Sequence, residues 1–228
     1  NSCKIGEYKN RNIIANPNCS TIQMLVALKP IYDAVGIERI TVSTYQAVSG
    51  SGTNAVNELA KQTAELLNGR DAECDVYPKQ IAFNVLPHID IFMDNGYTKE
   101  EMKMCWETQK IFGDENINVS ATCVRVPVFF GHSEAIQIET SDYIDEKQAR
   151  SLLEKAEGVT VIDERRDGGY PTPVHESAGS DPVFVGRIRK DISLKNGLNL
   201  WIVSDNVRKG AALNSIQIAE ELIKTYLN

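Results

Sequence analysis

The stretch NIIANPNCST, residues 12–21, shows most clearly how this chain is built. Its first five residues, with the apolar Ile13, Ile14 and Ala15 at their centre, are typical of a short buried strand. Pro17 ends that strand because proline cannot donate a ladder hydrogen bond. From Cys19 to Val35, apolar residues recur at helical spacing, and Gly36 stops the pattern. The sequence therefore predicts a strand, a turn and a helix that begins at Cys19, with Pro30 kinking or ending that helix.

Outside this stretch, strand and helix patterns mix without a regular strand–helix–strand repeat. Thr98 followed by Glu101 is a capping box, which marks the start of a helix. Gly131-His132-Ser133 separates two β-rich segments and predicts a hairpin or tight bend between them. Residues 165–182 form the one long loop. The predicted strands are 39–46, 119–130, 134–140, 159–162, 183–189 and 199–204, and the further helices are 54–68, 98–112, 145–157 and 206–226.

These elements predict an α+β fold, with a mixed, largely antiparallel sheet that helices cover on one face. Adjacent strands joined by short turns favour antiparallel neighbours, and the interspersed helices need an apolar surface to pack on. No GxGxxG motif follows a predicted strand, so this sequence does not encode a complete dinucleotide-binding fold.

The composition excludes several classes of protein. The chain has 228 residues, 42% of them hydrophobic, and a net charge of −7, which argues against binding to nucleic acid or to an anionic membrane. No apolar run is long enough to span a bilayer, so we expect a cytoplasmic protein. Five cysteines without CxxC spacing predict reduced thiols rather than disulfides or a metal site.

Cys19 is the first candidate for chemistry because it follows a strand and a turn and starts a helix. The unpaired N–H groups and the positive end of the helix dipole stabilise a thiolate at that position. A thiolate there can attack an acyl carbon, and the same N–H groups can hold the resulting oxyanion. A small structural cysteine is the commoner case, so the position alone leaves both interpretations open.

Other polar residues also allow two interpretations each. Arg125 lies in an apolar strand and must find an anion there, either an internal ion-pair partner or a bound carboxylate. His132, in a bend after that strand, is either a general acid–base or a structural loop residue. Glu100 and Lys103 face the same way on the first turn of a helix, as a solvated pair or as ligand contacts.

Several motifs together carry a resemblance to a known family. Asn16-Pro17-Asn18-Cys19-Ser20-Thr21 resembles the nucleophile segment of aspartate-β-semialdehyde dehydrogenases, whereas the related N-acetyl-glutamyl-phosphate reductases are expected to have Asn-Pro-Gly-Cys-Tyr. The further matches follow in order over nearly the whole chain. They are Gln46-Ala47-Val48-Ser49-Gly50, Glu100 with Lys103, Arg125 with His132, and Ser204-Asp205-Asn206-Val207-Arg208-Lys209-Gly210-Ala211-Ala212.

The resemblance implies the fold of the C-terminal domain of glyceraldehyde-3-phosphate-dehydrogenase-like enzymes. Residues 1–16 would be the remnant last strand of a dinucleotide-binding domain, 17–204 the catalytic and dimerisation domain, and 205–228 a helix that packs back on the first domain. Family members begin with that dinucleotide-binding domain, whose Gly-rich loop and phosphate-binding arginine this sequence does not contain. We therefore expect the chain by itself to bind NADP poorly and to be almost inactive.

The resemblance also implies roles for individual residues. Cys19 would be the nucleophile, His132 the acid–base, and Gln46 an amide that contacts both the substrate and Cys19. Arg125 would grip the substrate α-carboxylate. The remaining implied contacts are Glu100 with the substrate ammonium, Lys103 with phosphate, and Ser49, Gly50 and Asn206 with the nicotinamide end of NADP. No metal is implied.

The implied reaction is the NADPH-dependent reductive dephosphorylation of L-aspartyl 4-phosphate to L-aspartate 4-semialdehyde through a cysteine thioester. This step releases inorganic phosphate and lies on the route to lysine, threonine and methionine. The family also implies a homodimer or a dimer of dimers. Two alternatives stay open: an N-acetyl-glutamyl-phosphate reductase-like enzyme, and a non-catalytic pairing module of the same fold.

Overall fold

A computed structural model describes residues 2–227, with side chains from Lys4 to Leu227. Its centre is one six-stranded sheet in the order β2-β1-β3-β6-β5-β4. The β1–β2 and β4–β5 pairs are parallel, and the other three pairs are antiparallel. The strands are β1 (Arg39–Gln46), β2 (Asn118–Arg125), β3 (His132–Glu139), β4 (Val159–Val161), β5 (Val183–Lys190) and β6 (Gly197–Ser204).

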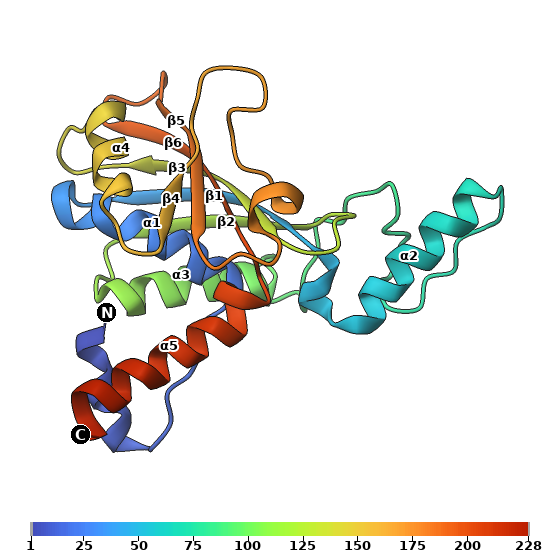
Figure 1. The fold of residues 1–228 in the computed structure, drawn as a ribbon, viewed down its shortest axis with the longest axis horizontal. Coiled ribbons are helices and arrows are strands. Elements are labelled where there is room, and N and C mark those ends of the chain that lie inside the picture. The colour runs from blue at the N-terminus through green and yellow to red at the C-terminus, as the bar shows by residue number, and fades with distance from the viewer. Residues whose placement is uncertain (1, 228) are drawn as a thin grey trace.

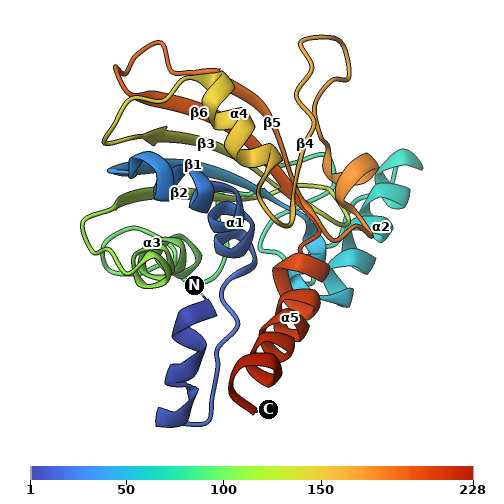
Figure 2. The ribbon, with the colours of Figure 1, turned by 60° about the vertical axis from the view of Figure 1, so that its left-hand side comes forward.

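Three helices cover one face of this sheet, as Figure 2 shows: α1 (Cys19–Val35), α3 (Lys99–Phe112) and α4 (Glu146–Glu154). Between them and the sheet lies the main core, which includes Met24, Leu28, Ile40, Ile136 and Leu198. The predicted α+β class, with a mixed and largely antiparallel sheet covered on one face, is confirmed. Among the described residues, no helix is both long and apolar enough to cross a membrane.

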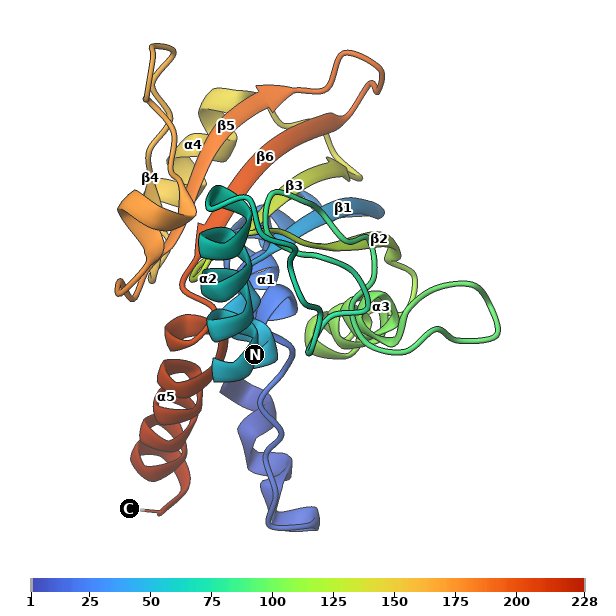
Figure 3. The same cartoon turned by 90° about the vertical axis from the view of Figure 1, so that its right-hand side faces the viewer.

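Two further parts extend from the sheet. Helix α2 (Thr53–Leu67) belongs to a lobe on one side of the molecule (Figure 1), and the short turn η2 (Val48–Ser51) joins it to β1. Helix α5 (Leu213–Leu222) projects from the sheet beside the N-terminal 3₁₀ segment η1 (Ser2–Asn10) (Figure 3). Single turns complete the chain at η3 (Pro173–Ser177), η4 (Arg208–Ala212) and η5 (Ile223–Leu227).

The start of α1 and the capping box of α3 are confirmed. Asn18 caps α1 through its side chain, which accepts hydrogen bonds from the N–H groups of Ser20 and Thr21. Thr98 and Glu101 form the predicted reciprocal capping box of α3. The sequence identified both helix starts because these caps are local interactions.

In three places the structure differs from a local prediction. The hairpin around residues 131–133 does not form, since β1 lies between β2 and β3. Pro30 neither ends nor interrupts α1, because the fully buried Leu28 and Ile31 hold the helix against the core. The predicted strand at residues 12–16 does not form: Asn12 lies in a turn with φ 54°, residues 13–16 pair with no described strand, and Ile13 is 72% exposed. A strand forms only where a neighbour supplies its hydrogen bonds.

The α2 lobe has its own small core and a buried carboxylate. Val48, Leu59, Tyr77 and Ile81 belong to that core, which therefore also anchors η2. Glu58, 5% exposed, accepts hydrogen bonds from the backbone N–H groups of three consecutive residues, 75–77. Residues 75–77 of the irregular segment after α2 thus take their backbone acceptors from one side chain, while Gln62 accepts from the N–H groups of Ile81 and Ala82.

We expect Glu58→Gln to loosen this lobe by about 1–3 kcal/mol, because the amide replaces an acceptor oxygen with a donor facing other donors. Hydrogen exchange at the amides of residues 75–77 should become faster than in the parent chain. The matched control is Glu154→Gln at an exposed position on α4, which should leave exchange in the lobe unchanged. Equal protection of these amides in both variants would contradict the assignment.

Candidate active site

The register of the sheet forms two rows of side chains on the face that the helices cover. Gln46 pairs with Arg125, Thr44 pairs with both Cys123 and Glu134, and His132 pairs with Ser204. One further step of the β1–β3 register places Gln46 next to His132. The first row consists of Arg125, Gln46, His132 and Ser204. The second row consists of Cys123, Thr44, Glu134 and Ile202. All eight side chains are buried.

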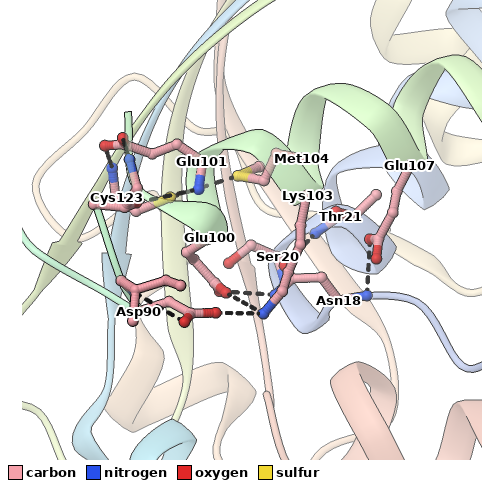
Figure 4. A network of polar contacts seen from close by, with 12 residues as sticks. Asn18, Ser20, Thr21, Asp90, Glu100, Glu101, Lys103, Met104, Glu107 and Cys123 are labelled. Carbon is pink, nitrogen blue, oxygen red and sulfur yellow. Dashed lines mark hydrogen bonds and ion pairs between the residues drawn. The ribbon is translucent and has the colours of Figure 1, made fainter. Parts of the chain in front are cut away.

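Cys19 enters this region at the first residue of α1, just after the cap residue Asn18. The Asn18 side chain accepts from the N–H groups of Ser20 (3.0 Å) and Thr21 (3.2 Å) and donates 2.7 Å to Glu100. The Asn18 N–H in turn donates 2.9 Å to Glu107. Figure 4 shows how Asn18 connects the start of α1 to α3. The Ser20 and Thr21 N–H groups, expected to hold a thiolate or oxyanion, are therefore engaged by the cap.

Glu100 is the centre of a polar network at the start of α3 (Figure 4). One carboxylate oxygen accepts from Asn18 and from the Gln46 amide (3.3 Å), and the other lies 3.4 Å from the Lys103 ammonium. Lys103 makes its shorter ion pair, 2.8 Å, with Asp90. The structure thus brings together Glu100, Lys103 and Gln46, three of the predicted substrate contacts.

Arg125 and His132 meet at the turn that follows β1. Arg125 donates 2.7 Å to the Ala47 carbonyl, and its Nε has no hydrogen-bond partner among the described residues. The Ala47 N–H donates 3.0 Å to His132 Nδ1. Arg125 makes no ion pair with a described carboxylate, so its buried charge is left for an anion from outside.

Ser49 and Asn206, both expected at the cofactor, also lie together. The Asn206 amide donates 3.0 Å to the Ser49 hydroxyl, and its oxygen accepts 2.9 Å from the Gly131 N–H. A Cβ on Gly50 would lie 3.0 Å from Arg125 Nη1 and 3.3 Å from His132, so only glycine leaves this space open. The N–H groups of Ser49 and Gly50 donate to the carbonyls of Phe129 and Ala47.

The electrostatics of Cys19 differ from the expected low-pKa thiol. Burial raises the pKa of Cys19 to about 12, and the Glu100 carboxylate raises it further, whereas the Ser20 backbone N–H and Arg125 oppose the rise. The Ser20 N–H is shared with the Asn18 side chain, and the Thr21 N–H donates to that side chain as well, so the helix end stabilises a thiolate less than expected. In this chain the thiol is therefore protonated at neutral pH.

The hydrogen bond at His132 Nδ1 determines which form of the imidazole is present. Burial, and then the nearby Arg125 charge, hold the pKa of His132 well below its ordinary value, so the ring is neutral. A neutral ring that accepts at Nδ1 carries its proton on Nε2. His132 is therefore arranged to donate a hydrogen bond from Nε2, whereas the sequence led us to expect an acid–base that takes the thiol proton.

Comparison with known proteins identifies the family of this chain. Residues 28–209 match the family described as semialdehyde dehydrogenase, dimerisation domain. The aspartate-semialdehyde dehydrogenase of Shewanella violacea is 66% identical over 222 residues, which cover 97% of this chain and 65% of that protein. The chain belongs to the aspartate-semialdehyde dehydrogenase family.

Two solved structures of this family show the same fold. Aspartate semialdehyde dehydrogenase II of Vibrio cholerae, complexed with ASA, is 61% identical, with a TM-score of 0.97 over 99% of this chain and 66% of that one. The Candida albicans enzyme with NADP is 26% identical, with a TM-score of 0.70 over 97% of this chain and 62% of that one. The chain spans about 65% of the length of its curated relatives.

Sequence reasoning missed the roles of three residues in this site. Asn18 had a detectable signal, since asparagine directly before a helix is a preferred N-cap. Asp90, the ion-pair partner of Lys103, lies in an irregular segment with no periodic pattern. Glu134 lies two residues after His132 on β3, and strand alternation could have placed both on one face.

We expect Glu100→Gln to shift the pH profile of Cys19 alkylation toward lower pH. Removing this carboxylate charge lowers the pKa of the thiol, so iodoacetamide should label Cys19 roughly three to ten times faster at pH 8. The measurement is mass-spectrometric mapping of Cys19 labelling between pH 6 and 11. Glu115→Gln, exposed just beyond α3, is the control, and identical profiles for both variants would show that Glu100 does not act on the thiol.

Proposed function

We propose that this chain carries the catalytic and subunit-pairing part of an NADPH-dependent aspartate-semialdehyde dehydrogenase. The observation that supports this most is the convergence of Cys19, at the start of α1, with the buried row of Arg125, Gln46 and His132. Arg125 has no described ion-pair partner, and a buried cation of this kind suits a carboxylate. The enzymes of Shewanella violacea and Vibrio cholerae are named for this activity.

The proposed substrate is L-aspartyl 4-phosphate, whose charges match the polar groups of the site. Arg125 would bind the α-carboxylate with its guanidinium, and Glu100 would face the ammonium. Lys103, held by Asp90 and Glu100, would meet the phosphate. The Lys103 and Asp90 side chains are both only partly buried. Lys103 could therefore exchange the Asp90 carboxylate for the substrate phosphate.

In the proposed reaction, Cys19 Sγ attacks the acyl carbon, the bond to the phosphate oxygen breaks, and the thiol proton leaves with the phosphate, which gives a thioester and hydrogen phosphate. NADPH, when bound, supplies the hydride that reduces the thioester carbonyl to a hemithioacetal. The His132 Nε2–H would stabilise negative charge on that oxygen, and Gln46 would hold the substrate against Cys19. Breaking the C–S bond then releases the aldehyde and returns the thiol.

The residues expected at the cofactor fit a flat ring that approaches this site. Gly50 leaves a space in front of Arg125 and His132 that any Cβ would fill. The Ser49 hydroxyl and the Asn206 amide border the same turn and can orient a carboxamide through hydrogen bonds. We therefore propose Ser49, Gly50 and Asn206 as the nicotinamide-side contacts of NADP.

The test is a chimera in which this chain replaces the matching 222-residue region of the Shewanella violacea relative. We expect phosphate-dependent reduction of NADP with aspartate semialdehyde, and we expect Cys19→Ala to lower it by roughly 10³-fold or more. Cys74→Ala, at an exposed cysteine, is the matched control and should keep full activity. An active Cys19→Ala chimera would rule out the thioester route, and an inactive but folded parent chimera would favour a non-catalytic pairing module.

We also propose that the uncovered face of the sheet pairs with a second copy, in line with the family's description as a dimerisation domain. Tyr45 on β1 is 37% exposed on this face, and its ring lies 5.7 Å from that of Trp201 on β6. Aromatic side chains that remain accessible at the centre of a sheet are typical interface anchors. The same strands carry the row of Arg125, Gln46, His132 and Ser204 on their other face. Pairing of two copies would therefore restrict the motion of the strands that hold the site.

We expect Tyr45→Glu to convert the dimer to a monomer, because it places a charge in the middle of the apolar contact. Sedimentation velocity at micromolar concentration measures the change. Tyr97→Glu, at a residue of nearly equal exposure (39%) ahead of α3, is the control and should remain dimeric. A dimeric Tyr45→Glu variant would place the interface elsewhere.

A further inference from the structure

Glu134 is a buried carboxyl inside the site, and the proposed reaction gives it no role. It is 0% exposed and lies on β3 in the second row, between Thr44 on β1 and Ile202 on β6. His132, two residues earlier, points to the same side of the sheet. Glu134 therefore lies one step along the sheet from the first row, beneath the start of α1.

The first turn of α1 presents polar side chains to this carboxyl. Ser20 and Gln23 are 0% and 1% exposed, and both lie close enough to Glu134 to affect its protonation. Neither Glu134 oxygen, nor Ser20 Oγ, nor Gln23 Nε2 completes a hydrogen bond of good geometry within residues 4–227. Unpaired polar atoms are rare in a protein interior, so four of them in one place indicate a cluster that shares a proton.

No positive charge compensates Glu134. None of the ion pairs of the described residues includes it, and its neighbours in the row are a hydroxyl and an alkyl group. A buried carboxylate without a partner is very costly, whereas a neutral carboxyl can donate one hydrogen bond and accept another. Burial accordingly raises the pKa of Glu134 well above its usual value.

The charge of Glu134 also matters to the nearby thiols. A negative charge at Glu134 raises the pKa of Cys19 on α1 and of Cys123 on β2. The other charged or titratable groups around this space are Glu100 and Glu101 on α3, Arg125 on β2 and His132 on β3. Glu100 already opposes the Cys19 thiolate, so a second carboxylate would make its formation harder still.

We infer that Glu134 is a positioning residue for Cys19, and that it supports the first turn of α1 as an uncharged carboxyl hydrogen-bonded to Ser20 and Gln23. This inference rests on the proposed role of Cys19 as the nucleophile. The uncharged carboxyl donates its proton to one α1 side chain and accepts from the Gln23 amide. Cys19 is thereby held over the row of Gln46 and His132 without an added negative charge.

The test compares Glu134→Gln, Glu134→Ala and the control Glu139→Gln, at a half-buried position on the same strand, in the 228-residue chain. Glutamine keeps one donor and one acceptor, so Cys19 alkylation by iodoacetamide should stay within about twofold of the parent between pH 7 and 9. Alanine removes the support, and the rate should change at least about fivefold. Glu139→Gln should match the parent.

Two outcomes would overturn the inference. If Glu134→Gln is labelled several times faster than the parent at the same pH, Glu134 was ionised and its charge was suppressing the thiolate. If Glu134→Ala matches the parent, the carboxyl does not position Cys19. Should the alanine variant fail to fold, Gln23→Ala removes the partner on α1 instead, and an unchanged rate there is equally decisive.

A second measurement tests the uncharged state without relying on Cys19. Because the pKa is raised in the folded chain, the unfolded chain loses this proton first, near 4.5, and the parent should lose stability relative to Glu134→Gln as pH rises above that value. Urea midpoints between pH 4 and 8 measure this difference, and parallel curves would show an ionised Glu134. Poor labelling of Cys19 in the parent would count against the proposed reaction. Urea midpoints of the parent and Glu134→Gln that diverge as pH rises would still support an uncharged Glu134.

Discussion

The register of β1 against its two neighbours is the constraint on which the site depends. Gln46 faces Arg125 in the parallel pair, and one step beyond Tyr45 in the antiparallel pair it reaches His132. Because alternate residues of a strand point to opposite faces, a shift of one residue on any of the three strands would turn its site residue toward the other face. The caps of α1 and α3 then bring Cys19 and Glu100 to a row that the sheet has already formed.

The charges around Cys19 balance in a way that suits a resting enzyme. Glu100 and burial keep the thiol protonated, while Arg125 is the cation that favours a thiolate. An ammonium against Glu100 would remove the larger opposing charge, whereas a carboxylate against Arg125 would remove the supporting one. The substrate we propose carries both an ammonium and a carboxylate. Its binding would therefore offset the effects of both Glu100 and Arg125 on the pKa of the Cys19 thiol.

Much of the local structure was predictable because it depends on neighbouring residues. Thr98 with Glu101 predicted the start of α3, and the spacing from Cys19 predicted α1, since caps and periodic burial are written within a few residues. The pairing of Ser49 with Asn206, 157 positions apart, followed only from the family resemblance. Glu134 and Asp90 were missed because their importance comes from burial and from partners on other elements, which spacing does not show. The low pKa expected for Cys19 was wrong for the same reason: the sequence showed the helix start but not the burial or the Asn18 cap.

The hairpin that does not form explains where the site lies. Had β2 and β3 paired directly, Arg125 and His132 would have been close to each other but separated from β1 and its terminal Gln46. Instead β1 lies between them, and the parallel β1–β2 pair brings the ends of both strands to one edge of the sheet, where antiparallel β3 begins. Residues 126–131 cross the end of β1, and Val126 and Val128 exchange backbone hydrogen bonds with Gln46 and Val48 there. The turn after β1 is thereby held against the start of β3, which places the Ala47 N–H on His132 and the Ala47 carbonyl on Arg125. A crossing that local sequence signals could not reveal thus fixes both the position and the protonation of the groups beside the thiol.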